Sequence, residues 1–199
     1  MSDKPDAALE ADANPLADYV GDMAERLGAE GFAVDFDTAR VFVAREKWVD
    51  TINEARKELP FFSWLSAIDW SRETEVGEGV AEPDELEERF EVMCRLSSVT
   101  DDKAIQFFAT VPKDDPTIES LTGSIGGAEW HEREAHEMFG IMFEGNNNLV
   151  PLYLPDEFIG NPLLKSFPLI AREVKPWPGE VDVEGLVSDQ DGDEEGDAS

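Results

Sequence analysis

Two neighbouring segments, residues 89–99 and 103–113, place an apolar residue at every second position, and this pattern most restricts the possible fold. The alternating residues are Phe90, Val92, Cys94 and Leu96, followed by Ile105, Phe107, Ala109 and Val111. Side chains two positions apart point to the same face of a strand, so each segment is predicted to be a strand with one apolar face. That face has to be buried against other elements of the chain.

Two helices, a β-hairpin and a further strand are predicted before these strands. Apolar residues recur at helical spacing in residues 15–27 and again in residues 48–59, where Pro60 would end the helix because it lacks a backbone donor. Residues 31–45 alternate around a short turn, which predicts a β-hairpin. The aromatic and apolar run at 61–70 predicts a largely buried strand.

A pair of helices is predicted at residues 116–127 and 127–140, after which the sequence loses its periodicity. Strands joined mostly by hairpins, with helices segregated between them, indicate an α+β fold with a small, mostly antiparallel sheet. An extended, proline-rich C-terminal arm is expected to follow this body.

Four regions are therefore expected along the chain: an acidic flexible leader at 1–14, the α+β body at 15–140, an arm at 141–179 and an acidic disordered tail at 180–199. The arm contains six prolines and isolated apolar residues. A long segment without secondary structure is unusual inside a compact domain, so we expect the arm to wrap around another protein.

The charge balance excludes some partners. The chain has 46 acidic and 16 basic residues and a formal charge of −30. This argues against binding to nucleic acid or to acidic lipid. Cys94 is the only cysteine, which excludes an internal disulfide and a cluster held by cysteines of this chain alone. No apolar run is long enough to predict a membrane helix, so attachment to a membrane is expected only through another subunit.

The run WHEREAHEMFG, residues 130–140, resembles a zinc-binding helix at first sight. Zinc proteases place two histidines four positions apart, whereas His131 and His136 are five apart and point about 140° from each other on a helix. Glu132 and His136 have the right spacing to share an ion, but the other ligands of a di-iron bundle are missing. We therefore expect no metal, and imidazoles that face solvent or a partner.

The charged residues between the histidines allow two readings. Arg133 and Glu137 can pair on one face of a helix, as in an ordinary solvated surface helix. Alternatively, the run Glu132, Arg133 and Glu134 belongs to a protein interface. No phosphate-binding loop, nucleophile elbow or dinucleotide fingerprint is present in the sequence, so the residues themselves indicate no catalytic centre.

Two motifs resemble the 30 kDa subunit family of respiratory complex I, also called the C subunit of NADH-quinone oxidoreductase. In the first motif a Trp-x-Glu-Arg-Glu helix ends with an acid, two apolar residues and a glycine; in the second, about twenty residues later, Gly-x-Pro-Leu-x-Lys-x-Phe-Pro-Leu follows. The matching residues are Trp130, Glu132, Arg133, Glu134, Glu137, Met138, Phe139 and Gly140, then Gly160, Pro162, Leu163, Lys165, Phe167, Pro168 and Leu169. The chain departs from the family at 146–151, where Asn-Asn-Asn-Leu-Val-Pro replaces a usual basic segment, and at Leu164.

This resemblance implies a non-catalytic scaffold subunit in the peripheral arm of a proton-pumping NADH:quinone oxidoreductase. It would bind no cofactor itself, because the iron–sulfur clusters, FMN and quinone belong to partner subunits. It would dock beside the quinone-site subunit, which resembles the NiFe hydrogenase large subunit, at the cytoplasmic face of the membrane. The implied interface residues are Trp130, Glu132, Arg133, Glu134, Glu137, Phe139, Gly140, Pro162, Leu163, Lys165, Phe167 and Pro168.

Two other functions stay open at this point. The chain could be the equivalent subunit of a membrane-bound hydrogenase or of another quinone-reducing complex. More remotely, it could be a free-standing metal hydrolase that uses His131, Glu132 and His136.

Overall fold

The computed structural model describes residues 15–36, 38–71 and 88–168. The chain divides into two compact units, Met1–Phe167 and Pro168–Ser199, and Pro168 is the only described residue of the second. The predictions for the leader and for the chain after residue 168 therefore lie outside the described residues.

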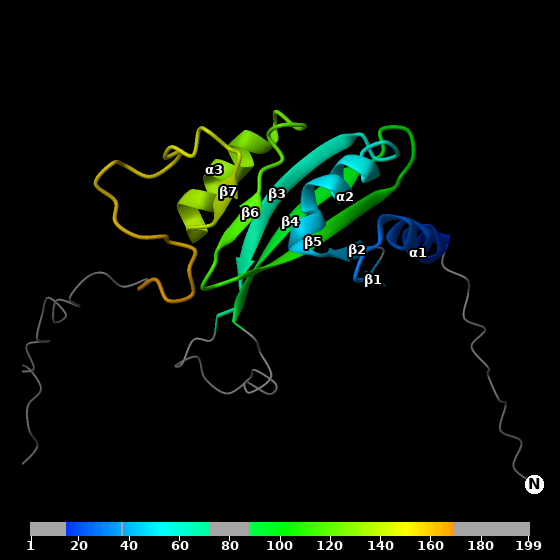
Figure 1. The fold of residues 1–199 in the computed structure, drawn as a ribbon, viewed down its shortest axis with the longest axis horizontal. Helices are drawn as coiled ribbons and strands as arrows, with labels where there is room; N and C mark the ends of the chain where they lie inside the picture. The colour runs from blue at the N-terminus through cyan, green and yellow to red at the C-terminus, as the bar shows by residue number, and fades with distance from the viewer. Residues whose placement is uncertain (1–14, 37, 72–87, 169–199) are drawn as a thin grey trace, which may run out of the picture. The chain divides into compact units, whose positions relative to one another are not determined.

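The described part of the chain contains helices and strands in the order α1, β1, β2, η1, α2, β3, β4, β5, β6, α3 and β7 (Figure 1). The helices are α1 (Pro15–Leu27), the 3-10 turn η1 (Arg45–Lys47), α2 (Trp48–Ala55) and α3 (Ala128–Phe139). The strands are β1 (Gly31–Asp35), β2 (Thr38–Val43), β3 (Phe61–Asp69), β4 (Arg89–Ser97), β5 (Ala104–Pro112), β6 (Thr117–Glu119) and β7 (Met142–Glu144).

The main sheet has five strands in the order β1-β2-β5-β4-β3. The pairs β1–β2, β3–β4 and β4–β5 are antiparallel, as the hairpin patterns predict, whereas β2 and β5 run parallel. The α+β class is thus confirmed, and the sheet is mixed although mostly antiparallel. The parallel pair arises because a crossover containing α2, β3 and β4 separates β2 from β5 in the sequence.

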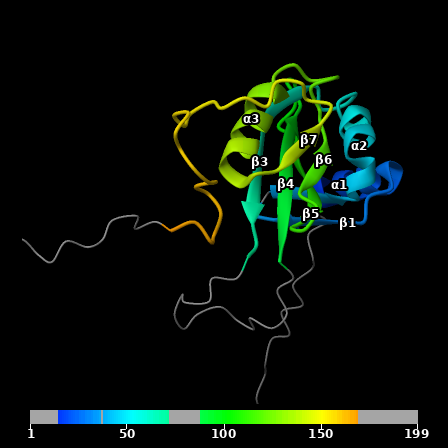
Figure 2. The same cartoon turned by 60° about the vertical axis from the view of Figure 1, so that its left-hand side comes forward.

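One face of this sheet forms the hydrophobic core. Val41, Phe107, Cys94 and Leu65 are paired in register across four strands, and each is buried. Helices α2 and α3 lie over the same face (Figures 1 and 2), and residues of α1 and α2 complete the core. The alternating apolar residues that predict strands β4 and β5 all belong to it.

The predicted helix at 116–127 is wrong. Residues 117–119 form strand β6, which pairs in parallel with β7, and turns follow it. The helical spacing came from Ile118, Leu121 and Ile125, all of which are buried. They reach the core from a short strand and a turn, because the backbone of β6 finds its hydrogen-bond partners in a segment some 25 residues later.

Two local expectations also need correction. Strand β3 is only half-buried, because it is an edge strand whose inward residues alone reach the core. Helix α2 ends at Ala55, and a turn carries the chain on to Leu59, which is fully buried. The other predicted elements, α1, the β1–β2 hairpin, β4, β5 and α3, are confirmed with small shifts of their ends.

Candidate subunit interface

Helix α3 carries the charged motif, and its end is defined by Gly140. The backbone of Gly140 has a φ of 79°, and its N–H donates to the carbonyl of His136 at 2.8 Å. A glycine adopts this left-handed conformation without a Cβ clash, so it suits the position after the last helical residue. A side chain here would also approach Asn161 to 3.2 Å.

Glu132 is completely buried on the inner side of α3. Its carboxylate accepts hydrogen bonds from the Ser120 hydroxyl at 2.7 Å, the Leu121 N–H at 2.7 Å and the Asn146 side-chain amide at 2.9 Å. Burial raises the pKa of this carboxyl, and the three hydrogen bonds oppose that shift. Glu132 therefore joins α3 to the turn after β6 and to the start of the arm, and its side chain does not reach the surface of the described structure.

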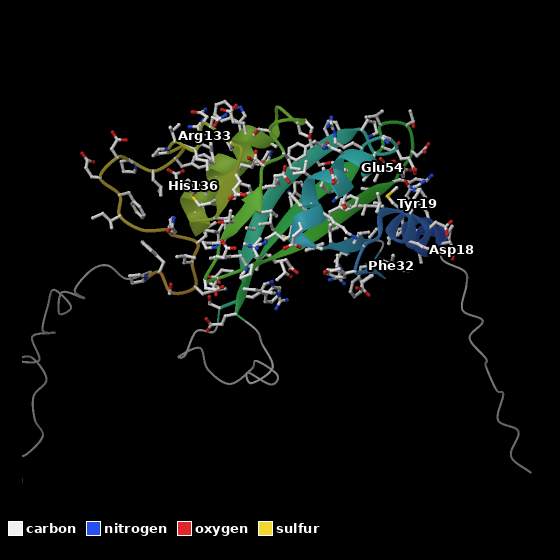
Figure 3. The ribbon with its side chains drawn as sticks, in the orientation of Figure 1. Asp18, Tyr19, Phe32, Glu54, Arg133 and His136 are labelled. Atoms are coloured by element: carbon white, nitrogen blue, oxygen red, sulfur yellow. The ribbon has the colours of Figure 1, made fainter. Side chains whose placement is uncertain are left out.

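Arg133 and Glu137 both bind the backbone of the arm. The Arg133 guanidinium donates to the carbonyls of Val150 and Pro151 at 3.0 and 2.8 Å. The Glu137 carboxylate accepts from three consecutive backbone N–H groups, those of Leu152, Tyr153 and Leu154, at 2.9–3.2 Å. The two residues thus hold residues 150–154 against α3, and Figure 3 shows Arg133 and His136 on the side of the helix that faces the arm.

The arm returns to the body at a second place. The Asn161 side-chain amide donates to the Glu137 carbonyl at 2.9 Å, and the Leu163 N–H donates to the Met138 carbonyl at 3.1 Å. These bonds satisfy carbonyl groups in the last turn of α3, which have no partner within the helix.

Asp69, at the end of β3, forms the last contact between the body and the described arm. This residue was not identified from the sequence. This buried carboxylate contacts the Lys113 ammonium at 2.6 Å and accepts from the Lys165 N–H at 2.9 Å and from Ser71. Burial alone would raise the pKa of Asp69, but the hydrogen bonds from Lys113, Ser71 and Lys165 lower it. Asp69 is the single charged residue in the apolar and aromatic run 61–70, and this feature could have identified it.

The two histidines point to different parts of the chain. The Nδ1 atom of His131 lies 3.1 Å from the carbonyl of Leu65 on strand β3, and that of His136 lies 2.8 Å from the carbonyl of Ile141. Since a carbonyl only accepts, both Nδ1 atoms carry the proton. Both imidazoles are half-buried, and each binds a backbone carbonyl of this chain, so neither is fully solvated.

The remaining residues of the predicted interface differ in exposure. Trp130 and Leu163 are exposed by 60% and 53%, Lys165 is exposed, and Glu134, Pro162 and Phe167 are half-buried. Phe167 stacks on Phe158 with the ring centroids 5.8 Å apart. Phe139 is buried in the core and Gly140 caps the helix, while Pro168 is exposed and belongs to the second unit. Side chains on the outer surface of α3 and the arm are therefore the ones available to another protein.

Asn146 and Asn148 form hydrogen bonds within this chain. Asn146 donates to Glu132, and its own side-chain oxygen accepts from the Asn148 N–H at 2.9 Å. The Asn148 amide also bonds the Glu129 carboxylate. Neutral donors thus satisfy two acidic groups of α3.

The attachment of residues 152–154 is expected to depend on pH. The backbone N–H groups of Tyr153, Leu154 and Leu152, aided by Arg133, outweigh desolvation and lower the pKa of Glu137. An acid with a lowered folded pKa contributes its stabilisation above its unfolded pKa, about 4.3, and loses it as the pH falls through the folded pKa. Amide NMR shifts of residues 152–154 should therefore move together at acid pH. Glu137→Gln should abolish this titration, and shifts that titrate unchanged in the variant would contradict the assignment.

Neither a metal site nor a membrane span is found in the described residues. No group of three or more His, Cys, Asp or Glu side chains there is arranged to hold an ion. None of the described helices has the length and apolar content needed to cross a bilayer.

Two solved structures share this α+β fold. One is the membrane-bound sulfane sulfur reductase, an archaeal respiratory membrane complex; a chain of it matches with a TM-score of 0.64 and 18% identity, over 92% of this chain and 98% of that one. The other is a trypsin-resistant fragment of Nqo5, with a TM-score of 0.50 and 23% identity, over 67% of this chain and 99% of the fragment. At these identities the likeness concerns the fold alone.

Curated relatives resemble the sequence more closely. A relative from Mycolicibacterium gilvum, named as the C subunit of NADH-quinone oxidoreductase, is 32% identical over 154 residues, 77% of this chain and 65% of the relative. The protein of that name from Roseiflexus sp. is 43% identical over 88 residues, 44% of this chain and 51% of the relative. The chain thus spans less than two thirds of the length of these relatives.

The family model described as "Respiratory-chain NADH dehydrogenase, 30 Kd subunit" matches residues 41–173, which include most of the sheet, α3 and the described arm. The chain belongs to this family, as the two motifs around α3 and the arm predict.

Proposed function

We propose that this chain is a non-catalytic scaffold subunit in the peripheral arm of a proton-pumping NADH:quinone oxidoreductase. The family match across residues 41–173 carries this proposal, because it includes both the sheet and the arm. Iron–sulfur clusters, FMN and quinone belong to partner subunits, and membrane attachment at the cytoplasmic face comes through them. One chain of the sulfane sulfur reductase, an archaeal respiratory membrane complex, has the same fold, which agrees with a role within such a complex.

The docking surface for the quinone-site subunit consists of the outer side of α3 and the arm. Apolar side chains on this surface are largely exposed: Trp130 by 60%, Tyr153 by 64%, Ile159 by 90% and Leu163 by 53%. Large apolar and aromatic residues grouped in this way are typical of protein interfaces. Arg133 and Glu137 contribute by holding the arm in place, and Glu132 by fixing α3 beneath it.

Co-purification from the membranes of the source organism tests this proposal. A tag on the full chain should recover the flavin, iron–sulfur and quinone-site subunits of an NADH:quinone oxidoreductase in equal amounts. Recovery of the chain alone, free of such subunits, would overturn the proposal.

The same experiment tests a second candidate, an equivalent subunit of a membrane-bound hydrogenase or another quinone-reducing complex. The fold similarity to the sulfane sulfur reductase favours this candidate. The second candidate would be supported over the NADH:quinone oxidoreductase if hydrogenase-type subunits co-purified and a flavin subunit that oxidises NADH did not.

Arg133→Ala is expected to reduce the amount of assembled complex several-fold. The substitution removes two hydrogen bonds that hold residues 150 and 151, and the arm then loses order that it has to regain on binding. Complex yield from membranes and turnover per complex should be measured together. Turnover per assembled complex should stay unchanged, and a normal yield with lost turnover would contradict the scaffold role. Arg26→Ala is the matched control, because it removes an exposed arginine of α1 that pairs with Glu58 and lies outside the proposed docking surface.

A further inference from the structure

The second face of the five-stranded sheet, opposite the helices, carries several large apolar residues among polar ones such as Arg40, Glu91 and Gln106. Its outward positions include aromatic and aliphatic residues from four strands or their ends: Phe42, Trp64, Ile68, Trp70, Met93 and Phe108. The Phe42 and Phe108 rings lie 5.7 Å apart. Strands that face water on one side usually alternate apolar and polar residues, whereas strands covered on both sides are apolar at successive positions. The runs of successive apolar residues in β4 and β5, Val92–Cys94 and Phe107–Ala109, therefore suit a sheet that is covered on both sides over this part.

The described helices α1, α2 and α3 all pack into the core on the opposite face. A groove of about 510 Å³ opens on this face. Ile68, Met93 and Phe108 are among its lining residues, and Phe36 lies at its rim. Phe36 has a φ of 49° and a fully exposed side chain. An aromatic residue in the left-handed region is strained, and within the described structure no burial of its ring compensates for that strain.

The charged side chains on this face differ in whether they have a partner in the described structure. Arg40 pairs with Asp35, and Glu91 accepts from the Trp70 indole N–H at 3.1 Å. Arg95 lies on the same face, in register with Trp64 and Gln106, and is half-buried. It has no hydrogen bond or ion pair to any residue that the structure describes. None of the Arg95 guanidinium nitrogens is buried without a partner, so the charge stays open to solvent and would stabilise a carboxylate on an occupant of this face.

We propose that this open face binds an amphipathic helix of another polypeptide, with its apolar side on the groove and an Asp or Glu beside Arg95. A helix about 10 Å across can lie on a sheet of this width and complete a three-layer arrangement of helix, sheet and helix. A second copy of this chain is disfavoured, since each copy carries a formal charge of −30. The surface is separate from that of α3 and the arm, so it gives the proposed scaffold a second contact.

Thiol labelling in the complex purified from membranes tests whether the face is covered. Gln106→Cys places a thiol in the groove, and Asp50→Cys places a control thiol on the exposed side of α2. The native Cys94 is buried, and burial raises the pKa of its thiol, so it does not compete. Maleimide should label Gln106→Cys about tenfold more slowly in the complex than in the isolated chain, because reactivity follows exposure. Asp50→Cys should show no such change.

The occupant is identified by attaching a benzophenone maleimide to the isolated Gln106→Cys chain, reassembling the complex and cross-linking it. The linked peptide should belong to another polypeptide, with apolar residues at helical spacing and an acid among them. Arg95→Glu should lower the cross-link yield about tenfold and Arg95→Lys should largely restore it, because charge reversal places like charges together.

Several results would overturn this inference. Labelling as fast in the intact complex as in the isolated chain would do so while leaving the proposed function in place. Cross-linking to a second copy of this chain, or an unchanged yield in Arg95→Glu, would also contradict it. If the chain purifies outside any oxidoreductase while another helix protects Gln106→Cys, the inference stands and the proposed function fails.

Discussion

Replacing Glu132 with alanine should lower the free energy of unfolding by about 3 kcal/mol, the cost of leaving buried donors without an acceptor. The donors are the Ser120 hydroxyl, the Leu121 N–H and the Asn146 amide. Chemical denaturation of the full chain measures the loss. Because the carboxylate joins three segments, the substitution should loosen both the turn after β6 and the start of the arm.

Two variants make the Glu132 prediction specific. Glu134→Ala changes a half-exposed residue on the same helix and should alter stability little. Glu132→Gln keeps an acceptor oxygen and should fall between wild type and Glu132→Ala. If Glu132→Ala and Glu134→Ala were equally stable, the buried network would not contribute as described.

Asp69→Ala should release the end of the described arm and make the bond after Lys165 more sensitive to trypsin. The Asp69 carboxylate holds the Lys165 N–H and contacts the Lys113 ammonium. Hydrogen bonds to a charged group contribute about 1.5–3 kcal/mol, so their loss should raise the open population about tenfold or more. The rate of tryptic cleavage after Lys165, followed by mass spectrometry, measures this population.

The control for Asp69 is Asp156→Ala, which removes an exposed carboxylate from the arm itself. Cleavage after Lys165 should be unchanged in that variant. Equal cleavage rates in wild type and Asp69→Ala would mean that other contacts hold this part of the arm.

The sequence patterns correctly predicted those elements whose formation depends on residues close together in the chain. The alternation in 89–113 placed β4 and β5 and their shared apolar face, and Gly140 marked the end of α3. The two motifs around α3 identified the family. These features follow from side-chain periodicity and backbone conformation, both of which are determined within a few residues.

Features that depend on distant partners could not be predicted in this way. Thr117–Glu119 is a strand because Met142–Glu144 pairs with it, and β2 is parallel to β5 because β3 and β4 lie between them in the sequence. The same holds for the charged residues of α3. Helical spacing suggested a pair between Arg133 and Glu137, but the arm presents carbonyl and N–H groups that each of them binds. Spacing alone does not distinguish Glu132 from the surface acids of a very acidic chain.

Helix α3 holds the arm by its main chain, and this has a consequence for how the protein can change over time. Arg133 and Glu137 contact carbonyl and N–H groups of residues 150–154, which most amino acids supply equally. The outward side chains, such as Val150 and Tyr153, can therefore be exchanged without loosening this attachment. Because Arg133 and Glu137 alone among the described residues hold this backbone, the outward side chains are free to change together with those of a partner protein.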